Sequence, residues 1–443
     1  MQERLFNVQT TLQAIANKAS ELPDYRFRNL FGLLNQDMLN DSWQFIRKNA
    51  AAGVDGMSAK EYEQNLDENI RQLVDDLKRK RYRAKNVLRR YIPKPDGKLR
   101  PLGIPATQDK LLQLSVKRIL EAIYEQDFLR CSFGFRPNLS ALDAVDQLTI
   151  KLQFGKYNFV VEADIKGFFD NIDHVWLLKM LAERIDDKAI LWLIEKWLKA
   201  GVLDTDGKVL HPVTGSPQGG IISPILANIY LHYALDLWFQ KVVIPLCSGE
   251  ACLIRYADDF VCAFEKEEDA IRFYAVLGER LGKFGLELAA VKTQIIKFSP
   301  KTALGKSSFD FLGFEFRWGL DRSGNPHLNK RTARKNLRKS IQRFNLWIKD
   351  NRHLFLPDLF KLLNAKLRGH FNYFGVFGNL SSLSELKYHV VRTLFKFLNQ
   401  RSQRKSYNWS RFNLLLSKFG LVNPYIFSRP KRHKALTLSS PLP

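Results

Sequence analysis

The chain has 443 residues, of which 45% are hydrophobic and 12% aromatic, enough to bury a sizeable core in two or three domains. Its apolar runs are too short to cross a bilayer, and the start, "MQERLFNVQT", lacks the basic-then-apolar layout of a signal peptide, so we expect a cytoplasmic protein without membrane contact. The four cysteines form no C-x-x-C pair and have no histidine cluster near them, so the sequence implies neither a zinc site nor a disulfide framework, and we expect core thiols.

Positive charge is concentrated in the last part of the chain. The net charge is +24, and residues 321–443 hold 25 Lys and Arg against four acids, or +21, which leaves +3 for residues 1–320. A basic region of this strength predicts a polyanionic partner. Nucleic acid fits better than an anionic membrane, because no lipid anchor or membrane-lying amphipathic segment accompanies the charge. A solubilising surface without a dedicated partner is the alternative.

The predicted elements of the first half alternate between helices and strands. Residues 30–90 read mainly as helix, and "YIPKPDGKLRPLGIPATQD" at 91–109 predicts two strands around a Pro-Asp-Gly turn. Helical periodicity follows at 109–126 and returns at 173–201, on either side of a buried strand at 158–165 that ends at an acid. The pattern indicates a mixed α and β fold.

The second half begins with a glycine-rich loop that leads into a helix, "TGSPQGGIISPILANIYL". Ser223 is the predicted N-cap of this helix and Pro224 its first residue. Residues 281–299 predict a helix followed by a strand, and residues 309–319 predict a strand. Past residue 325 the pattern is helical almost to the end.

The stretch "RYADDFVCAF" places two adjacent carboxylates, Asp258 and Asp259, between two strand-like runs, and so predicts a tight hairpin turn. Asp is common in ordinary turns, but a second strand, "FVVEAD", ends at Asp164 and meets the hairpin if the two strands are neighbours in one sheet. Clustered carboxylates repel one another unless a divalent cation binds, and Mg²⁺ held by carboxylates and substrate phosphates is a common arrangement. The pattern favours a nucleic-acid polymerase, in which two ions activate a 3′ hydroxyl and stabilise the leaving pyrophosphate.

The order of sequence blocks resembles the reverse transcriptases encoded by bacterial group II introns. Tyr256-Ala257-Asp258-Asp259 matches the aromatic-x-Asp-Asp hallmark of that family. Further matching blocks come in family order: "AAAGVDGMS", "YIPKPDGKLRPLGIPATQDKLLQ", "SFGFRPNLSALDAV", "VVEADIKGFFDNIDH", "TGSPQGGIISPILANIYL", "LIRYADDFVCAF", "GLELAAVKTQII" and "FDFLGFEF". They cover residues 35–316, and "LNAKLRGHFNYFGVFGN" at 363–379 is similar to the thumb, or maturase, region of the family.

The resemblance implies an α+β right-hand polymerase with fingers, a palm built on an antiparallel sheet, a helical thumb and a small basic C-terminal module. The expected divisions are an N-terminal extension with the start of the fingers at 1–90, fingers at 91–160, palm at 161–320, helical thumb at 321–384 and a basic DNA- or RNA-binding region at 385–443. Nothing after Pro424 resembles the zinc-dependent H-N-H endonuclease of many family members, and this layout resembles that of class C intron proteins.

The activity implied by the resemblance is that of an RNA-directed DNA polymerase. It would extend a DNA or RNA primer with dNTPs on an RNA template such as a group II intron, and assist splicing and retromobility of that intron. Two Mg²⁺ ions, or Mn²⁺ in their place, are the implied cofactors. The alternatives are an RNA-dependent RNA polymerase, whose turn usually carries Gly-Asp-Asp, a maturase that mainly binds intron RNA without catalysis, and a domesticated relative in phage defence or DNA repair.

The resemblance also assigns the catalytic and metal-binding residues. Asp164, Asp258 and Asp259 are the expected catalytic carboxylates and metal ligands, with the backbone of Ile165 as a further ligand. Phe169 matches the steric gate of the family, where a bulky ring occupies the space that a ribose 2′ hydroxyl needs. Its alternative role is that of a core aromatic.

Six further nucleotide contacts follow from the matching blocks. The adjacent Phe168 is the alternative gate, and the backbone at Gly167 is expected to turn close to the triphosphate. Gln218 in "SPQG" resembles the glutamine that packs against nucleotide and template. The expected basic contacts to phosphate are Lys94, Arg100 and Lys292, of which Arg100 lies in the more closely matched segment.

A basic amphipathic helix is predicted in "NKRTARKNLRKSIQRFNLWIKD". Apolar residues recur on one side at Leu337, Ile341, Phe344 and Ile348. Basic residues recur on another side at three- and four-residue spacing: Arg331, Arg334, Lys335, Arg338 and Lys339. The segment follows the palm-like region and precedes the thumb-like one, so we expect the basic side to bind nucleic-acid backbone. A merely solvated charged face is the alternative.

Overall fold

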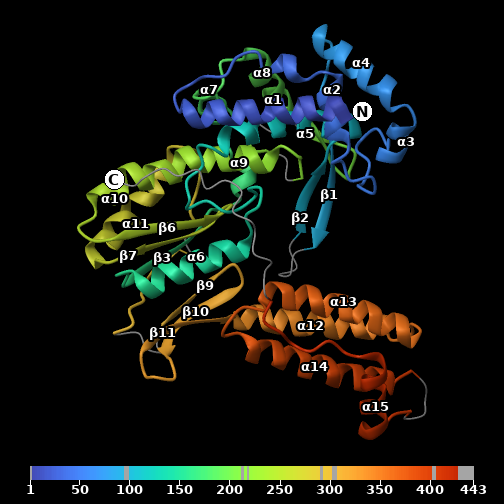
Figure 1. Ribbon diagram of the computed structural model, residues 1–443, viewed down its shortest axis with the longest axis vertical. Helices are drawn as coiled ribbons and strands as arrows, with labels where there is room; N and C mark the ends of the chain where they lie inside the picture. Colours follow the sequence, from blue (N-terminus) through green and yellow to red (C-terminus); the bar gives the residue numbers. More distant parts are fainter. Residues whose placement is uncertain are drawn as a thin grey trace. The chain divides into compact units, whose positions relative to one another are not determined.

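A computed structural model describes residues 2–93, 99–210, 214–216, 219–289, 293–301, 307–401 and 406–427. The chain divides into two compact units, Met1–Ala303 and Leu304–Pro443, each described here by itself (Figure 1). Three residues of the predicted nucleotide site lie outside the described residues: Lys94, Gln218 and Lys292. Within the described part of the chain, no helix combines the length and apolarity needed to cross a bilayer.

The first unit begins with a layer of helices, as the sequence predicted for residues 30–90. These elements are α1 (Gln2–Glu21), the short 3-10 helix η1 (Phe31–Leu33), α2 (Gln36–Trp43), α3 (Ala59–Gln64) and α4 (Leu66–Lys78). The side chain of Asn35 caps α2, and Ser58 with Glu61 forms a capping box at α3. Helices α1 and α2 pack on α5 (Thr107–Tyr124), which confirms the helix expected over 109–126.

A small sheet follows this helical layer, in the order β2-β1-β4-β5. The strands are β1 (Val87–Pro93), β2 (Leu99–Ile104), β4 (Val202–Leu203) and β5 (Val209–Leu210). Strands β1 and β2 form the antiparallel hairpin that the Pro-Asp-Gly stretch predicted, although the turn itself lies outside the described residues. Strand β4 then adds in parallel beside β1.

The second sheet of this unit has the order β6-β7-β3-β8, and all of its strand pairs are antiparallel. Its strands are β3 (Phe159–Asp164), β6 (Ala251–Tyr256), β7 (Asp259–Phe264) and β8 (Gln294–Lys297). Helix α6 (Ala141–Phe154) packs on β6, and α11 (Glu267–Gly282) packs on β3 and β7 (Figure 1). The sheet confirms the strand predicted at 158–165 and the two strand-like runs predicted on either side of Asp258 and Asp259.

Two helix predictions need correction. The pattern over 173–201 forms two helices, α7 (His174–Ala182) and α8 (Lys188–Leu198), because the side chain of Asp187 accepts bonds from the backbone N–H groups of Ala189 and Ile190 and so starts a new helix. Helix α9 (Ser223–Leu231) begins at Ser223, one residue earlier than predicted, so Ser223 is not its N-cap, and the buried Ser223 hydroxyl accepts a hydrogen bond from Ser216.

Helix α9 continues through two π-helical turns, η3 (His232–Asp236) and η4 (Phe239–Val243), into the short α10 (Ile244–Leu246). Apolar side chains from α9, η3, α5, α7 and the β6-β7-β3-β8 sheet share one buried core. The short 3-10 helix η2 (Phe168–Asp170) lies directly after β3. This core therefore fixes the sheet edge at which Asp164 and the hairpin turn meet.

The second unit opens with a three-stranded antiparallel sheet of order β11-β10-β9. Its strands are β9 (Ser308–Phe311), β10 (Phe314–Leu320) and β11 (Pro326–Thr332), so the strand predicted at 309–319 contains a turn at Leu312–Gly313. The helical prediction past residue 325 was wrong for β11, which pairs along β10 and buries Leu328 opposite Trp318. This sheet spans the expected division at residue 320.

Four helices follow this sheet within the described residues of the second unit: α12 (Arg334–Asn351), α13 (Leu356–Phe374), α14 (Leu380–Leu398) and α15 (Trp409–Phe419). The predicted apolar side of α12 is confirmed, since Leu337, Phe344 and Ile348 are buried in the core that these helices share. Asn379 ties the helices to the sheet, because its side chain accepts from the backbone N–H of Thr332 and donates to the Thr332 hydroxyl.

Candidate active site

The structure brings the ends of the two acid-bearing strands together. Asp164, the last residue of β3, pairs in register with Asp259, the first residue of β7. Tyr256 pairs with Asp259 across β6 and β7, so the connecting turn consists of Ala257 and Asp258. Opposed residues of an antiparallel pair project from the same face of a sheet. The strand adjacency required by the sequence argument is thus present.

The donor chemistry of these three residues fits a hard divalent cation, because carboxylate oxygens are the ligands that Mg²⁺ prefers. Asp259 is exposed, and Asp164 and Asp258 are half-buried, so solvent reaches this edge of the sheet. Among the described residues, however, no group of three His, Cys, Asp or Glu side chains lies close enough together to hold an ion. A metal-binding role for the three aspartates therefore stays a prediction.

The backbone turns directly after Asp164, in the segment for which the sequence predicts a contact with a triphosphate. The Ala289 N–H donates to the Asp164 carbonyl at 2.8 Å, and buried Ile165 bridges to Leu288. Gly167 then adopts a left-handed conformation with φ +57°, which glycine takes without the cost of a Cβ. The side chain of Asn171 donates to the Lys166 carbonyl and closes this turn.

The two adjacent phenylalanines occupy different environments. Phe168 is buried, with 2% of its surface exposed, and its ring packs against Tyr230 in the core. Phe169 is half-buried and meets the exposed ring of Phe135 edge-on, at 6.2 Å between ring centroids. Of the two rings, Phe169 is thus the one with a surface available to a nucleotide.

The described residues on either side of Gln218 contact Phe169 and strand β2, both of which carry predicted nucleotide contacts. On one side the Ser216 N–H donates to the Phe169 carbonyl at 2.8 Å. On the other side Gly219, with φ +112°, approaches β2 so closely that a Cβ there would lie 2.5 Å from the Gly103 carbonyl oxygen. Arg100 lies on the same strand, opposite Ile92, and is exposed. The loop flanks thus join Phe169 to the strand of Arg100.

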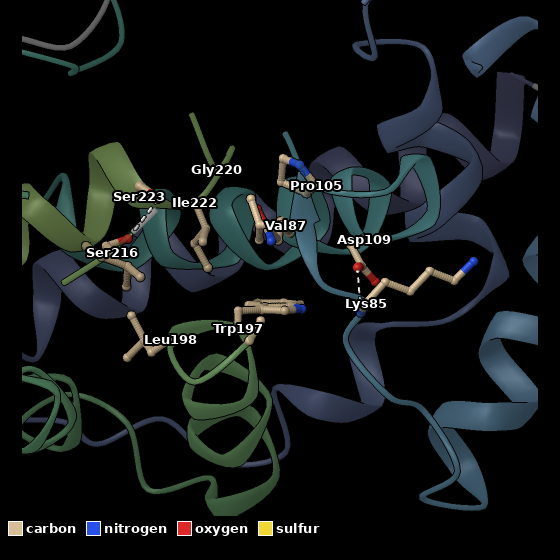
Figure 2. A pocket seen from close by; sticks show the side chains of 13 residues that line it. Lys85, Val87, Pro105, Asp109, Trp197, Leu198, Ser216, Gly220, Ile222 and Ser223 are labelled. Atoms are coloured by element: carbon tan, nitrogen blue, oxygen red, sulfur yellow. Dashed lines mark hydrogen bonds between the residues drawn. The ribbon is translucent and has the colours of Figure 1, made fainter. Parts of the chain in front are cut away.

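A narrow cavity of about 10 Å³, room for about one water molecule, lies beneath this loop (Figure 2). Figure 2 shows the Ser216–Ser223 hydrogen bond at one end of it and the bond between the Lys85 backbone and Asp109 at the other. None of the three candidate catalytic aspartates lines it. The cavity therefore lies apart from the candidate aspartates and is too small for a nucleotide.

A buried arginine next to the hallmark was missed by the sequence analysis. Arg255 precedes Tyr256 and is fully buried, and it forms an ion pair with equally buried Asp236 of η3. The signal was present in "CLIRY", where one charged residue interrupts an apolar strand. Its partner is 19 residues away in the sequence, so spacing alone could not identify the pair.

The predicted basic face divides between two elements. Arg334, Lys335 and Arg338 are exposed on α12, and Lys339 is half-buried. Arg331 does not belong to the helix, because it lies in β11 and its guanidinium makes two bonds to Glu315. A hollow of about 360 Å³ beside these residues is lined by acidic as well as basic side chains. The Lys335 ammonium lies 3.1 Å from the Asp310 carboxylate there.

Two parts of the sequence match known protein families. Residues 92–316 match the family "Reverse transcriptase (RNA-dependent DNA polymerase)", and residues 334–414 match "Group II intron, maturase-specific domain". The first match covers half of the chain and contains the strands that carry Asp164, Asp258 and Asp259. The second match covers α12 to α14 and part of α15.

Similar proteins come from bacteria and from yeast. "Group II intron-encoded protein LtrA" of Lactococcus lactis subsp. cremoris is 29% identical over 85% of this chain and 75% of its own length. "Protein YkfC" of Escherichia coli is 36% identical over 56% of this chain and 73% of its own length. "Putative COX1/OXI3 intron 2 protein" of Saccharomyces cerevisiae is 38% identical over 39% of this chain and 20% of its own length. With the β3–β7 carboxylates inside the matched region, the chain belongs to the reverse transcriptases, and it carries the maturase-specific domain of group II intron proteins.

Proposed function

We propose that the RNA-directed DNA polymerase reaction of this chain takes place where β3 ends beside the start of β7. Asp164 and Asp258 would hold two Mg²⁺ ions, with Asp259 supporting the ion on the primer side and the Ile165 carbonyl as a further ligand. The observation that carries this proposal is the register pairing of Asp164 with Asp259 beside the Ala257–Asp258 turn. When bound, the ions supply charge neutralisation for attack of the primer 3′ hydroxyl and departure of pyrophosphate.

The remaining residues of the site would bind and orient the nucleotide. Phe169 would exclude a ribose 2′ hydroxyl, supported by its half-buried ring and its contact with Phe135. The left-handed turn at Gly167 would bring backbone close to the triphosphate. Arg100 would bind phosphate oxygens together with Lys94 and Lys292, while Gln218 packs on the nucleotide. Positioning of this kind lowers the barrier without new covalent chemistry by the protein.

We assign the parts of a right hand to the two units on the same reasoning. The β1–β2 hairpin and the segment 91–160 would form the fingers, and the antiparallel sheet carrying the aspartates would form the palm. The segment 321–384, which holds α12, α13 and the start of α14, would form the thumb, followed by the basic region 385–443. The thumb would hold the template–primer backbone, since 25 of the 69 Lys and Arg residues lie past residue 320.

The test of the metal site is Asp258→Asn, which keeps side-chain size and removes the charge. We expect the rate of primer extension with dNTPs and Mg²⁺ to fall by several orders of magnitude, because a metal ligand is removed, while template–primer affinity stays within a few-fold of wild type. Asp24→Asn removes an exposed carboxylate elsewhere in the first unit and serves as the charge control. Extension by Asp258→Asn at the Asp24→Asn rate would refute the assignment.

We also infer that the chain assists splicing of a group II intron RNA, on the strength of the maturase-specific match at 334–414. The Asp258→Asn protein provides the test, because splicing assistance needs RNA binding and no nucleotide addition. We expect it to accelerate splicing of a group II intron RNA at low Mg²⁺ as well as wild type does. If neither protein changes the splicing rate, a role outside splicing, such as phage defence or DNA repair, becomes the better assignment.

A further inference from the structure

The turn that carries Asp258 is backed by the buried ion pair of Arg255 and Asp236. Both side chains are 0% exposed, and they meet through two hydrogen bonds, Nε to Oδ1 at 2.7 Å and Nη2 to Oδ2 at 2.5 Å. Arg255 lies in β6 one residue before Tyr256, whereas Asp236 comes from the π-helical turn η3. The pair thus joins the hairpin strand to the helix behind it.

Every N–H group of the Arg255 guanidinium has an acceptor. Beyond the two bonds to Asp236, Nη1 donates to the Asn228 side chain at 3.1 Å and to the Ala257 carbonyl at 3.0 Å, and Nη2 donates to the Ser132 hydroxyl at 2.8 Å. A guanidinium has five N–H donors in a rigid planar fork, and a lysine ammonium has three. The site is therefore shaped for arginine.

The acceptor in the turn, Ala257, has an uncommon backbone conformation. Its φ is +56°, a left-handed value that a residue with a Cβ adopts at some cost. The bond from Arg255 to the Ala257 carbonyl holds the peptide between Ala257 and Asp258 in this orientation. That peptide sets the direction in which Asp258 leaves the backbone, and Asp259 is the next residue.

A second contact closes on the turn from the "SFGF" segment. The Asn228 side chain donates to the Gly134 carbonyl at 2.6 Å and also accepts from Arg255. Gly134 approaches the turn so closely that a Cβ there would lie 2.3 Å from the Ala257 nitrogen. The turn is therefore held between the guanidinium and a glycine backbone, which explains the position of this glycine.

Stability alone is a weak reason for such a pair. Removing two charges from water opposes folding, and well-packed apolar residues often replace a buried ion pair without destabilising the fold. Burial alone would lower the pKa of Arg255, but the carboxylate of Asp236 and, more weakly, that of Asp258 raise it above its usual value. The guanidinium thus stays charged and close enough to Asp258 for an electrostatic interaction.

We propose that Arg255 is a positioning residue that fixes the Ala257–Asp258 turn, and through it the directions of the Asp258 and Asp259 carboxylates, for binding of the divalent cations. This proposal rests on the metal site proposed above. Arg255 touches neither substrate nor metal in it and acts through its bond to Ala257. Weakening this bond should therefore reduce metal affinity more than it reduces the stability of the fold or the affinity for nucleic acid.

The test compares Arg255→Lys with a matched control, Arg184→Lys. Arg184 is also buried, pairs with Asp127 at 3.1 Å and donates to the carbonyls of Ala19 and Leu22, far along the chain from the turn. Both variants keep the charge and remove the planar fork. We would measure Mn²⁺ affinity by electron paramagnetic resonance titration of the full chain with template, a dideoxy-terminated primer and a dNTP, which prevents turnover.

For Arg255→Lys we expect Mn²⁺ affinity to fall about tenfold and the Mg²⁺-dependent extension rate to fall about 10- to 100-fold, in line with displacement of catalytic groups by about an ångström. Template–primer affinity should stay unchanged. Arg184→Lys should lower the melting temperature and leave Mn²⁺ affinity at the wild-type value. Equal Mn²⁺ affinity in both variants would overturn the proposal and leave the pair as a structural ion pair only.

Two further proteins keep the test decisive. If Arg255→Lys does not fold, Ser132→Ala removes one acceptor of the guanidinium at little cost in volume, and a folded Ser132→Ala with wild-type Mn²⁺ affinity would overturn the proposal. The Asp258→Asn variant distinguishes a failure of the positioning role of Arg255 from a failure of the metal site on which that role rests. If Asp258→Asn abolishes Mn²⁺ binding and Arg255→Lys does not weaken it, only the positioning role fails, whereas unchanged binding by Asp258→Asn removes the metal site itself.

Discussion

Asp164 and Asp259 face each other in register across β3 and β7, so their side chains project from the same face of the sheet. The two residues are expected to differ in importance, since Asp164 would bind both ions and Asp259 would support one. We expect Asp164→Asn to abolish measurable primer extension and Asp259→Asn to leave a slow residual rate. Single-turnover extension at saturating dNTP measures both. A lower rate for Asp259→Asn than for Asp164→Asn would reverse the assignment.

The environments of the two phenylalanines predict separable effects. Phe169→Ala should raise the use of ribonucleotides relative to deoxyribonucleotides in a folded enzyme, because the half-buried ring no longer fills the space of a 2′ hydroxyl. Phe168→Ala is the matched control and should cost about 3–5 kcal/mol of stability as a buried aromatic truncation, without a change in sugar selectivity. Competition between rNTP and dNTP in primer extension, with thermal unfolding alongside, distinguishes them. An unchanged ratio in folded Phe169→Ala would place the gate elsewhere.

The basic face of α12 predicts a change in salt dependence. Replacing Arg334 and Arg338 with Ala should weaken template–primer binding and lower the steepness of log affinity against log salt by about 0.7–0.9 for each phosphate that the protein no longer neutralises. Replacing Lys188 and Lys199, exposed on or beside α8, provides a control with the same change in charge. Parallel salt slopes for wild type and the Arg334/Arg338 variant would show that the face is only solvated.

Arg331 should behave differently from its neighbours on α12. Because its guanidinium makes two bonds to Glu315 across β10 and β11, Arg331→Ala leaves a mostly buried carboxylate without its partner. We therefore expect a lower melting temperature and little change in the salt slope. A reduced slope with an unchanged melting temperature would return Arg331 to the residues that bind nucleic acid.

Asp109, at one end of the cavity in Figure 2, predicts a pH-dependent stability. Burial raises the pKa of Asp109 to about 6, although bonds from the Tyr82 hydroxyl and the Lys85 backbone oppose the shift. Between about pH 4, where unfolded Asp titrates, and the folded pKa, the folded chain holds a proton that the unfolded chain has released. The contribution of Asp109 to stability should therefore fall as pH rises through this window and stay constant above it.

The measurement is the difference in urea unfolding free energy between wild type and Asp109→Asn at several pH values. The difference should change by an amount on the order of 2 kcal/mol between about pH 4 and pH 6. Other groups titrate there too, because burial raises the pKa of Asp127 to about 6 and lowers that of His232 to about 4. They are present in both proteins and cancel in the difference. Identical pH profiles would contradict the shift.

The sequence was sufficient where a signal was local. Strands β3, β6 and β7 are short apolar runs bounded by the acids or by the turn that carries them, so both the strands and their ends could be predicted. Strand β11 was missed because "PHLNKRT" buries little beyond Leu328 and owes its conformation to pairing with β10. The Asp187 cap was missed because helical periodicity continues across it.

The site was predicted in part for the same reason. The sequence pattern marks the strand ends at which Asp164, Asp258 and Asp259 lie. It could not show that the two strands are neighbours in one sheet, which had to be assumed. The partners of Arg255 are Ser132, in a loop, and Asn228 and Asp236, on the continuous helix formed by α9 and η3. No sequence pattern connects that helix or Ser132 with Arg255, since the fold alone brings them together.

The π-helical turn η3 has a consequence for insertions and deletions in this region. Asn228 and Asp236 are eight residues apart, which on an uninterrupted α-helix would place them about 80° apart around the axis, yet both bind the one guanidinium of Arg255. The wider turn of η3 reduces the rotation per residue and so closes that angle. Deleting one residue within 232–235 together with the wide turn would place Asp236 seven α-helical residues, or about 700°, from Asn228 and so still within about 20° of the same face. An inserted residue would instead rotate Asp236 by about 100° away from Arg255.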